Sequence, residues 1–282
     1  MMQQVDLYKS EADAAYQGAP GAYSEEAARI LLGTDVRLMP CATLEQAFDA
    51  VADARTHHAV VAVENALSGT VPTVYELLLS HDLVVSGETV INIDHVLVGP
   101  PGTVWAGIRR VMSHPIALEQ CADFFRSHRG IQAVSVFDTA GAVRLAVDAG
   151  DVTTAAIASR RAAALYGAEI VAEHIQDHRD NWTRFLLLSS AAHAIRVDSP
   201  QKALLAFGLR HQPGALIQAL QPIADAGLSI TKIEGRPIPG TPFEYRFIVE
   251  ITAAGGEAIA PGAYEAVKRA TTWFKVLGAF RR

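Results

Sequence analysis

Short apolar runs alternate with helix-like stretches along most of the chain. Buried strands are expected at residues 59–63, 83–85, 91–98, 110–112, 133–136 and 155–157. Helices are expected between them, at residues 24–32, 44–56, 72–80, 113–127 and 139–149. Strands that alternate with helices in this way predict a mostly parallel α/β sheet. The pattern restarts after Pro100-Pro101-Gly102 and returns late at Thr183, so we predict two α/β lobes that face a cleft.

The order of elements changes after residue 202. A strand, a helix, two strands, a helix and a last strand are expected at residues 203–209, 213–226, 229–234, 245–252, 264–270 and 273–277. This βαββαβ order is typical of a ferredoxin-like module. The segment 191–201, with a break at Ser199-Pro200, is the expected linker before it.

Composition and charge narrow the class of protein. The chain has 282 residues, 50% of them hydrophobic and 19% charged, which suits two or three compact units with sizeable cores. The formal charge of -6 and the lack of a long basic run argue against a nucleic-acid partner. No apolar run approaches the roughly 20 residues that a membrane helix needs, so no membrane association is expected.

The compartment is suggested by the first residues and by the cysteines. The segment Met1–Asp6 has neither the basic start nor the apolar core of a signal peptide. Cys41 and Cys121 are far apart and form no metal-ligand pair, so free thiols in a reducing cytoplasm are expected.

Polar residues gather at four junctions between a predicted strand and the following helix: Gly18–Ser24, Glu64–Thr70, Ser113-His114-Pro115 and Asp138-Thr139. In open α/β sheets, ligands bind just outside the carboxyl ends of the strands, and helix N-termini there favour anions. Each junction alone could be only a helix cap, and Ser24 has the expected position of an N-cap. Glu64 suits a ligand contact or general acid as well as a cap, and His114 suits helix entry better than catalysis.

The segment Asn181-Trp182-Thr183-Arg184-Phe185 adds a hydroxyl beside a guanidinium at the start of an apolar strand. The strand would hold Thr183 and Arg184 at its mouth, where we expect both to face the cleft. Arginine recognises carboxylates through a planar fork of donors, and threonine can donate a hydrogen bond to a leaving oxygen. With the four junctions, this pair favours a site for a compound with more than one carboxylate.

The C-terminal module contains two further segments of interest. Pro213–Leu216 lies at a strand-to-helix turn, and Glu234–Pro237 lies at a strand end. They could bind a small ligand together, because Gly214 would allow its backbone to approach closely, or both could be simple turns.

From about Ala14 onwards, the chain resembles prephenate dehydratase with a C-terminal ACT regulatory domain. The resemblance is carried by the loop 18–24, by Val63–Val71, by Ser113–Cys121, by the N-x-T-R-F segment 181–185, and by the two C-terminal segments. Ala22, Ala66 and Ile116 depart from the residues usual in the family. Gly235 replaces the serine of the family's E-S-R-P segment.

This resemblance implies a domain plan. A two-lobed α/β catalytic domain, like that of periplasmic binding proteins, would span residues 12–190, and a ferredoxin-like ACT domain would span residues 202–282. Lobe one would comprise about 12–98 plus 181–190, and lobe two about 99–180. The chain before Gly18 is too short for the helical chorismate mutase domain that some relatives carry, so a monofunctional enzyme is expected.

The resemblance also implies a reaction, a carbon–oxygen lyase step that converts prephenate to phenylpyruvate, carbon dioxide and water in phenylalanine biosynthesis. The catalytic residues it implies are Thr183, Arg184 and Phe185. Arg184 would hold a carboxylate of the substrate. No metal and no organic cofactor is implied. The substrate-binding residues it implies are Ser24, Glu64, Asn65, Ser68, Gly69, Thr70, Ser113, Thr139 and Asn181.

Feedback regulation is implied as well. Phenylalanine would bind between paired ACT modules, so a homodimer or homotetramer is expected. Two other readings of the sequence stay open, namely an arogenate dehydratase and a non-catalytic two-lobed protein that binds a small molecule. The effector-binding residues implied for phenylalanine are Gly214, Ala215, Leu216, Glu234, Arg236 and Pro237.

Overall fold

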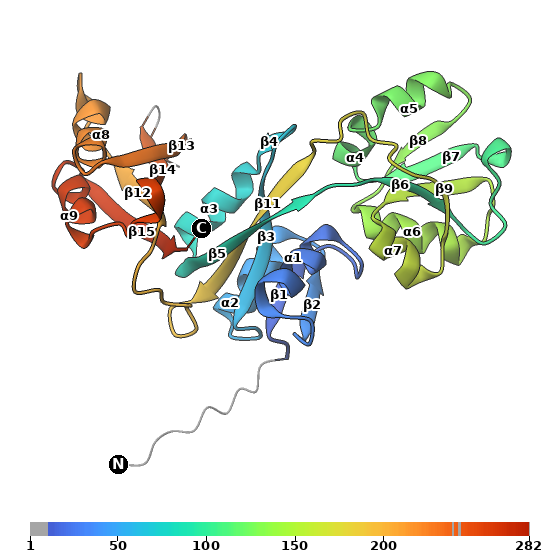
Figure 1. The fold of residues 1–282 in the computed structure, drawn as a ribbon, viewed down its shortest axis with the longest axis horizontal. Helices are drawn as coiled ribbons and strands as arrows, with labels where there is room; N and C mark the ends of the chain where they lie inside the picture. The colour runs from blue at the N-terminus through green and yellow to red at the C-terminus, as the bar shows by residue number, and fades with distance from the viewer. Residues whose placement is uncertain (1–10, 239, 242–243, 282) are drawn as a thin grey trace, which may run out of the picture. The chain divides into compact units, whose positions relative to one another are not determined.

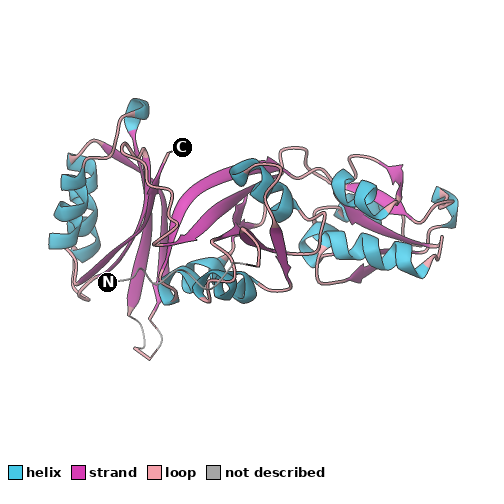
Figure 2. Ribbon diagram, turned by 90° about the horizontal axis from the view of Figure 1, so that it is seen from below, coloured by secondary structure: helices cyan, strands magenta, loops and turns pink. Residues whose placement is uncertain are grey.

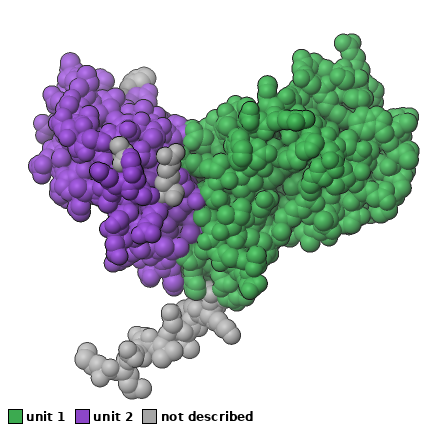
Figure 3. Space-filling view, viewed as in Figure 1, with its two compact units in different colours: residues 1–74, 89–185 green, residues 75–88, 186–282 purple. Residues whose placement is uncertain are grey.

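The computed structural model describes residues 11–238, 240–241 and 244–281. Two compact units, coloured separately in Figure 3, divide the chain. The first unit contains the described residues up to Val74 together with Thr89–Phe185. The second contains Tyr75–Glu88 together with the described residues from Leu186 onwards. The segment Met1–Asp6, in which no signal peptide was expected, lies outside the described residues.

One part of the first unit, the first lobe, contains the edge strand β2 and its neighbours β1 and β3 (Figure 1). β1 runs parallel to β2 on one side and to β3 on the other. β3 is followed in the sheet by β11, and the short β4 pairs with β3 in an antiparallel hairpin. The bounds are β1 Ala14–Gln17, α1 Tyr23–Leu32, β2 Leu38–Cys41, α2 Leu44–Ala52, β3 His58–Asn65 and β4 Gly69–Thr70. Three further elements, α3 Pro72–Ser80, β5 Leu83–Asn92 and β11 Trp182–Ser190, belong partly to the first unit and partly to the second, so the predicted boundary of the catalytic domain at residue 190 does not coincide with the division into units.

The second lobe of this unit is a five-stranded sheet with the order β10-β6-β9-β7-β8. Apolar side chains cover both faces of its inner strands, so β6 and β9 are fully buried, whereas the edge strand β8 is mostly exposed. Leu97 and Ile157 pack with Phe124 on one face, whereas Val96 and Val98 pack beneath α6 on the other. The bounds are β6 Val96–Gly99, a 3-10 turn Trp105–Gly107, β7 Arg110–Ser113, α4 Pro115–Glu119, α5 Ala122–Ser127, β8 Gln132–Ser135, α6 Thr139–Ala149, β9 Thr154–Ala158, α7 Arg160–Tyr166 and β10 Glu169–Ala172.

The expectation of a mostly parallel sheet is only partly correct for the second lobe. β7 runs parallel to β8 and β9, but β6 runs antiparallel to both β9 and β10. β6 and β10 lie in the segments by which the chain enters and leaves this lobe, so they are not joined to β7 by the crossover helices that make strands parallel.

The C-terminal part of the second unit confirms the predicted βαββαβ order. Its strands form the antiparallel order β13-β14-β12-β15, and both helices lie on one face of the sheet (Figure 2). Leu205, Phe207 and Ile223 form the centre of the core between the sheet and its helices. The bounds are β12 Lys202–Gly208, α8 Ala215–Asp225, β13 Leu228–Pro237, β14 Tyr245–Ala253, a 3-10 turn Ala254–Gly256, α9 Pro261–Arg269 and β15 Trp273–Phe280.

Several predicted boundaries are wrong. The helix expected at 113–127 is two helices that break at Gln120 and Cys121, because the Asp177 carboxylate accepts the backbone N–H groups of Ala122 and Asp123 and starts α5 there. The helix expected at 44–56 ends at Ala52, and the strand pair at 83–85 and 91–98 divides instead into β5 and β6. Within the described residues, no helix is long and apolar enough to cross a membrane.

A glycine in β15 has no room for a side chain. A β-carbon at Gly278 would overlap the backbone carbonyl oxygen and the side chain of Val85 in β5. Backbone cannot move aside as a flexible side chain can, so we expect Gly278→Ala to lower the free energy of unfolding by about 1–3 kcal/mol in a urea titration.

The matched control is Gly262→Ala. A β-carbon at Gly262, in the first turn of α9, would meet no atom within 4 Å. Alanine is the better helix former, so this variant should be neutral or slightly more stable than the wild type. Equal unfolding midpoints for the two variants would contradict the steric account of Gly278.

Candidate active site

A cavity of about 200 Å³ lies in the first unit, and residues from all four predicted strand-to-helix junctions line it. β11 contributes to it as well, as does the segment that joins β5 to β6. Because these elements come from both lobes, only the assembled unit contains the cavity. The lining residues are Gln17, Gly18, Ala22, Tyr23, Ser24, Ala62, Glu64, Asn65, Val71, Ile93, His95, His114, Ile116, Ala117, Gln120, Phe137, Asp138, Thr139, Thr183 and Phe185.

The glycine-rich loop between β1 and α1 is fixed against the second lobe. The backbone N–H of Ala19 donates to the Asp138 carboxylate at 2.9 Å, and the Ser159 hydroxyl donates to the Gly21 carbonyl at 3.0 Å. Gly21 has a φ of 92°, and a β-carbon there would lie 2.9 Å from the Cα of Ala162. Glycine is therefore required at this position for the loop to reach α7.

Ser24 lines the cavity but is not the N-cap that the sequence suggests. The N-cap of α1 is Ala22, which makes no side-chain capping bond, and Ser24 already lies within the helix. Its hydroxyl instead donates a short hydrogen bond to the carbonyl of Gln17 at the end of β1. The hydroxyl thus joins the end of the strand to the start of the helix beside the cavity.

Glu25 holds the same loop from behind. One of its carboxylate oxygens accepts the Gly21 N–H at 2.6 Å, and the other accepts from Arg161 at 2.7 Å and from Arg29 at 3.0 Å. Burial raises the pKa of Glu25, but the hydrogen bonds from Gly21, Arg161 and Arg29 lower it by more, and the result lies below the ordinary 4.5. This ion pair joins α1 of the first lobe to α7 of the second.

Asn65, at the end of β3, makes the central polar contact of the cavity. Its Oδ1 accepts the backbone N–H groups of Leu67 and Ser68, at 3.0 and 2.9 Å. Its Nδ2 donates to the Thr183 hydroxyl oxygen at 2.9 Å and to Oδ1 of Asn181 at 2.7 Å. Because the Thr183 oxygen accepts from Asn65, the hydroxyl proton of Thr183 can point into the cavity.

The expectation that Thr183 and Arg184 both face the cleft is wrong for Arg184. Successive side chains of a strand point to opposite faces, so Thr183 and Phe185 line the cavity and Arg184 does not. The Arg184 guanidinium lies 3.5 Å from the Glu64 carboxylate. Arg184 therefore affects the cavity by pairing with Glu64, whose side chain lines it.

The structure brings some of the other predicted site residues to the cavity and not the rest. Glu64, Asn65 and Thr139 line it, as Ser24 does. Ser113 is fully buried and its hydroxyl donates to the carbonyl of Ile157, so it makes no contact with the cavity. The remaining predicted residues are adjacent to the lining rather than part of it: Ser68, Gly69, Thr70 and Asn181.

Sequence reasoning missed several lining residues, among them Tyr23, His95 and Gln120. Gln120 stands within a quoted motif but was not singled out, and no motif marks His95. His114 caps α4 by accepting the Ile116 N–H at 3.2 Å, which confirms its predicted role in helix entry, although it also lines the cavity. Burial lowers the pKa of both His95 and His114, so both rings are neutral at neutral pH.

The second unit contains a smaller cavity of about 140 Å³, and Ala215 and Leu216 of the predicted effector segment line it. Gly214 is the N-cap of α8, with a φ of 79°. The described lining residues do not include Glu234, Arg236 or Pro237, which lie on β13. Among the described residues, this cavity therefore contains the first effector segment and not the second.

Two α/β lobes around a shared cavity, with a ferredoxin-like module attached, are typical of proteins that bind small molecules. The family model described as prephenate dehydratase matches residues 14–193. The chain is 35% identical, over 97% of its length and 74% of the relative's, to an arogenate dehydratase/prephenate dehydratase from Arabidopsis thaliana. It belongs to the prephenate dehydratase family, and it is accordingly a carbon–oxygen lyase of the hydro-lyase type.

Solved structures agree with this assignment. The prephenate dehydratase from Arthrobacter aurescens in complex with L-Phe has a TM-score of 0.84 and 26% identity, with 95% of this chain and 90% of that chain covered. A protein described as GqqA, a novel type of quorum quenching acylase, has a TM-score of 0.84 and 33% identity, with 95% and 97% covered. The acylase activity in that description belongs to that protein.

The lowered pKa of Glu25 gives a pH-dependent prediction. Folding lowers this pKa, so the stability it contributes is present above 4.5 and is lost as the pH falls through the folded-state value. We expect Glu25→Gln to lower the free energy of unfolding at neutral pH by about 1–2 kcal/mol, because Arg161 and Arg29 lose their carboxylate partner. The deficit should shrink as the pH falls below 4.5.

Urea titrations at a series of pH values test this prediction. Glu76→Gln serves as the matched control, since Glu76 is an exposed carboxylate in the middle of α3. The control should show no pH-dependent deficit. A deficit for Glu25→Gln that persists unchanged into the acid range would contradict the assigned role.

Proposed function

We propose that this enzyme catalyses the decarboxylating dehydration of prephenate to phenylpyruvate, as a step in phenylalanine biosynthesis. The observation that carries the proposal is the Thr183 hydroxyl, whose oxygen accepts from Asn65 and whose proton is left for a ligand in the cavity. Membership of the prephenate dehydratase family supports the same reaction. Catalysis here is dehydration coupled to loss of carbon dioxide, and aromatisation of the ring drives it.

In this reaction the ring carboxylate leaves as carbon dioxide, and the electron pair of the broken C–C bond enters the ring. The C–O bond to the ring hydroxyl breaks at the opposite carbon, and the leaving oxygen takes a proton relayed from solvent water and departs as water. A donor that meets the leaving oxygen stabilises the charge that develops on it in the transition state. Thr183 supplies that hydrogen bond, and a threonine hydroxyl is too weak an acid to lose its proton outright.

The surroundings of Thr183 suit a hydrogen-bond donor rather than a free acid. Thr183 itself is buried, and Phe185 beside it limits the access of water. The N-terminus of α6, with Thr139 at its first position, offers backbone N–H groups at the cavity wall for a carboxylate of the substrate. We therefore assign substrate anchoring to this helix start. In this structure Arg184 supports the site through Glu64.

Arogenate is the second candidate substrate, and the charges of the cavity favour it. The charged residues among its described lining are the carboxylates Glu64 and Asp138, and neither lysine nor arginine is among them. Arogenate has an ammonium group where prephenate has a keto group, so it presents a cation to these carboxylates. The ratio of kcat/KM for the two compounds distinguishes the candidates.

Replacing the Thr183 hydroxyl is the direct test of the reaction. Thr183→Ala should lower kcat by about a hundredfold or more, because one transition-state donor is lost from a buried site. Thr183→Ser keeps the hydroxyl and should stay within about tenfold of the wild type. The appearance of the aromatic product is followed from prephenate and from arogenate separately.

The outcomes of this experiment differ clearly. If Thr183→Ala binds either compound and turns it over as fast as the wild type, the assigned role of Thr183 is wrong. If the well-folded wild type turns over neither compound, the chain is a two-lobed binding protein rather than a dehydratase of these substrates.

We further propose that residues 202–282 form an ACT regulatory domain that binds phenylalanine between two paired chains. The βαββαβ order of this module supports the assignment, as does the bound L-Phe of the Arthrobacter aurescens relative. Among the described residues, Arg236 is not part of the cavity that Leu216 lines, which supports a ligand site completed by a second copy. The same proposal includes a homodimer or homotetramer, and a cytoplasmic location is proposed with it.

Phenylalanine should therefore lower the initial rate as its concentration rises. Gly235 is exposed, and a β-carbon there would lie 3.7 Å from the Tyr245 ring, in ordinary contact. Gly235→Ser, which restores the residue usual in the family, should fit without strain and make the inhibition tighter. A flat response of both proteins to phenylalanine would sink the regulatory proposal, and light scattering that shows only monomers would sink the pairing.

A further inference from the structure

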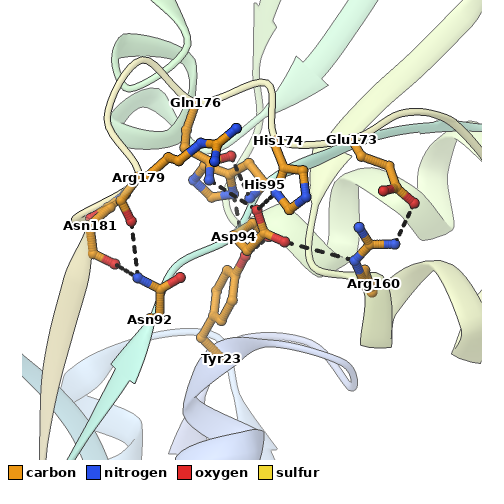
Figure 4. Close-up of polar contacts among 10 residues, drawn as sticks. All are labelled: Tyr23, Asn92, Asp94, His95, Arg160, Glu173, His174, Gln176, Arg179 and Asn181. Carbon is orange, nitrogen blue, oxygen red and sulfur yellow. Dashed lines mark hydrogen bonds and ion pairs between the residues drawn. The ribbon is translucent and has the colours of Figure 1, made fainter.

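His95 is a buried polar residue of the cavity to which the proposed reaction gives no role. It lies in the segment that joins β5 to β6, is 1% exposed, and belongs to the group of polar side chains drawn in Figure 4. Its backbone N–H donates to the Gln176 side chain at 3.0 Å. Its ring Nε2 lies 3.1 Å from Oε1 of Gln120, and its Nδ1 lies 3.4 Å from the Tyr23 hydroxyl.

The hydrogen-bond directions in this network follow from the backbone outward. Oδ1 of Asn65 accepts two backbone N–H groups, so the orientation of the Asn65 amide is fixed. The Gln120 atom that faces this oxygen, at 3.4 Å, must be a donor and is therefore Nε2. Oε1 of Gln120 then faces His95, and because it can only accept, the ring must carry its proton on Nε2.

The result is a chain of donors that all point the same way. His95 Nε2 donates to Gln120, Gln120 Nε2 donates to Asn65, and Asn65 Nδ2 donates to the oxygen of Thr183. No acceptor for the Thr183 hydroxyl proton is present in the described part of the chain, so this proton is available to a ligand in the cavity. Hydrogen bonds linked in one direction polarise one another, which makes the last group a better donor.

We infer that His95 is a positioning residue for the reaction, one that sets the orientation of Gln120 and thereby keeps the Thr183 hydroxyl as a donor to the leaving oxygen. This inference rests on the proposed function of the cavity. His95 acts through Gln120 and Asn65 and does not itself touch the substrate's leaving group.

The other ring nitrogen of His95, Nδ1, takes no part in the chain of donors. The Tyr23 hydroxyl donates to the backbone carbonyl of Asp94 at 2.7 Å, so it does not donate to Nδ1 of His95. Burial disfavours the charged imidazolium, so Nδ1 keeps a lone pair. The network therefore needs a donor at the position of Nε2 and not at the position of Nδ1.

This difference gives a matched pair of variants. The side-chain amide nitrogen of glutamine can occupy the position of Nε2, whereas that of asparagine reaches only as far as Nδ1. His95→Gln should keep kcat within about threefold of the wild type, and His95→Asn should lower kcat about tenfold, the rate equivalent of one lost buried hydrogen bond. KM should change little in both, because the lost interaction acts in the transition state.

A double variant separates positioning from a merely structural role. If His95 acts through Thr183, adding His95→Asn to Thr183→Ala should cost nothing further in kcat, because the hydroxyl is already absent. Kinetics use whichever of prephenate and arogenate the wild type turns over. Three outcomes would overturn the inference. His95→Asn could be as fast as the wild type, or His95→Gln and His95→Asn could lose the same amount of kcat. The losses of His95→Asn and Thr183→Ala could also multiply in the double variant.

A measurement that needs no turnover keeps this inference distinguishable from the proposed reaction. Long-range ¹H–¹⁵N correlations of the histidine rings report the tautomer, and the signal that disappears in His95→Gln is that of His95. The inference requires the neutral tautomer with its proton on Nε2. A proton on Nδ1, or a charged ring at neutral pH, would overturn it whatever compound the enzyme acts on.

Discussion

The orientation of the Asn65 amide is the constraint on which the rest of the cavity depends. Two backbone N–H groups of the turn after β3 fix its oxygen, so its nitrogen must face β11 and meet the hydroxyl of Thr183. An amide held by backbone cannot flip without leaving buried donors unpaired, which is costly. The direction of every hydrogen bond from His95 to Thr183 follows from this one orientation.

The same constraint explains why the site needs both lobes. Asn65 and Thr183 come from the first lobe, whereas Gln120 comes from the second, and the hydrogen bond from Gln120 to Asn65 crosses between the lobes. The glycine-rich loop also joins them, since Ala19 donates to Asp138 and Glu25 pairs with Arg161. The cavity is thus held together by contacts between residues far apart in the sequence.

A substrate with two carboxylates would suggest lysine or arginine side chains around it, but the charged residues among the described lining are the carboxylates Glu64 and Asp138. The guanidinium of Arg184 lies against Glu64, and the Asp138 carboxylate is occupied by the backbone N–H groups of Ala19 and Gly141. The inner surface is therefore largely apolar, and neither His95 nor His114 adds a charge at neutral pH. Anchoring by backbone N–H groups fits this surface better than a cluster of cations does.

The sequence by itself determined the α/β order of the first part and the βαββαβ module, because apolar periodicity is a local property. It also indicated that four polar junctions meet at one cleft, because polar residues follow the carboxyl ends of strands that share a sheet. Tertiary structure alone decided which residues face the cavity. Strand alternation turns Arg184 away from it, and close packing makes Ser113 structural. His95 carries no local signal, since its role arises only when Gln120 is brought beside it from another part of the chain.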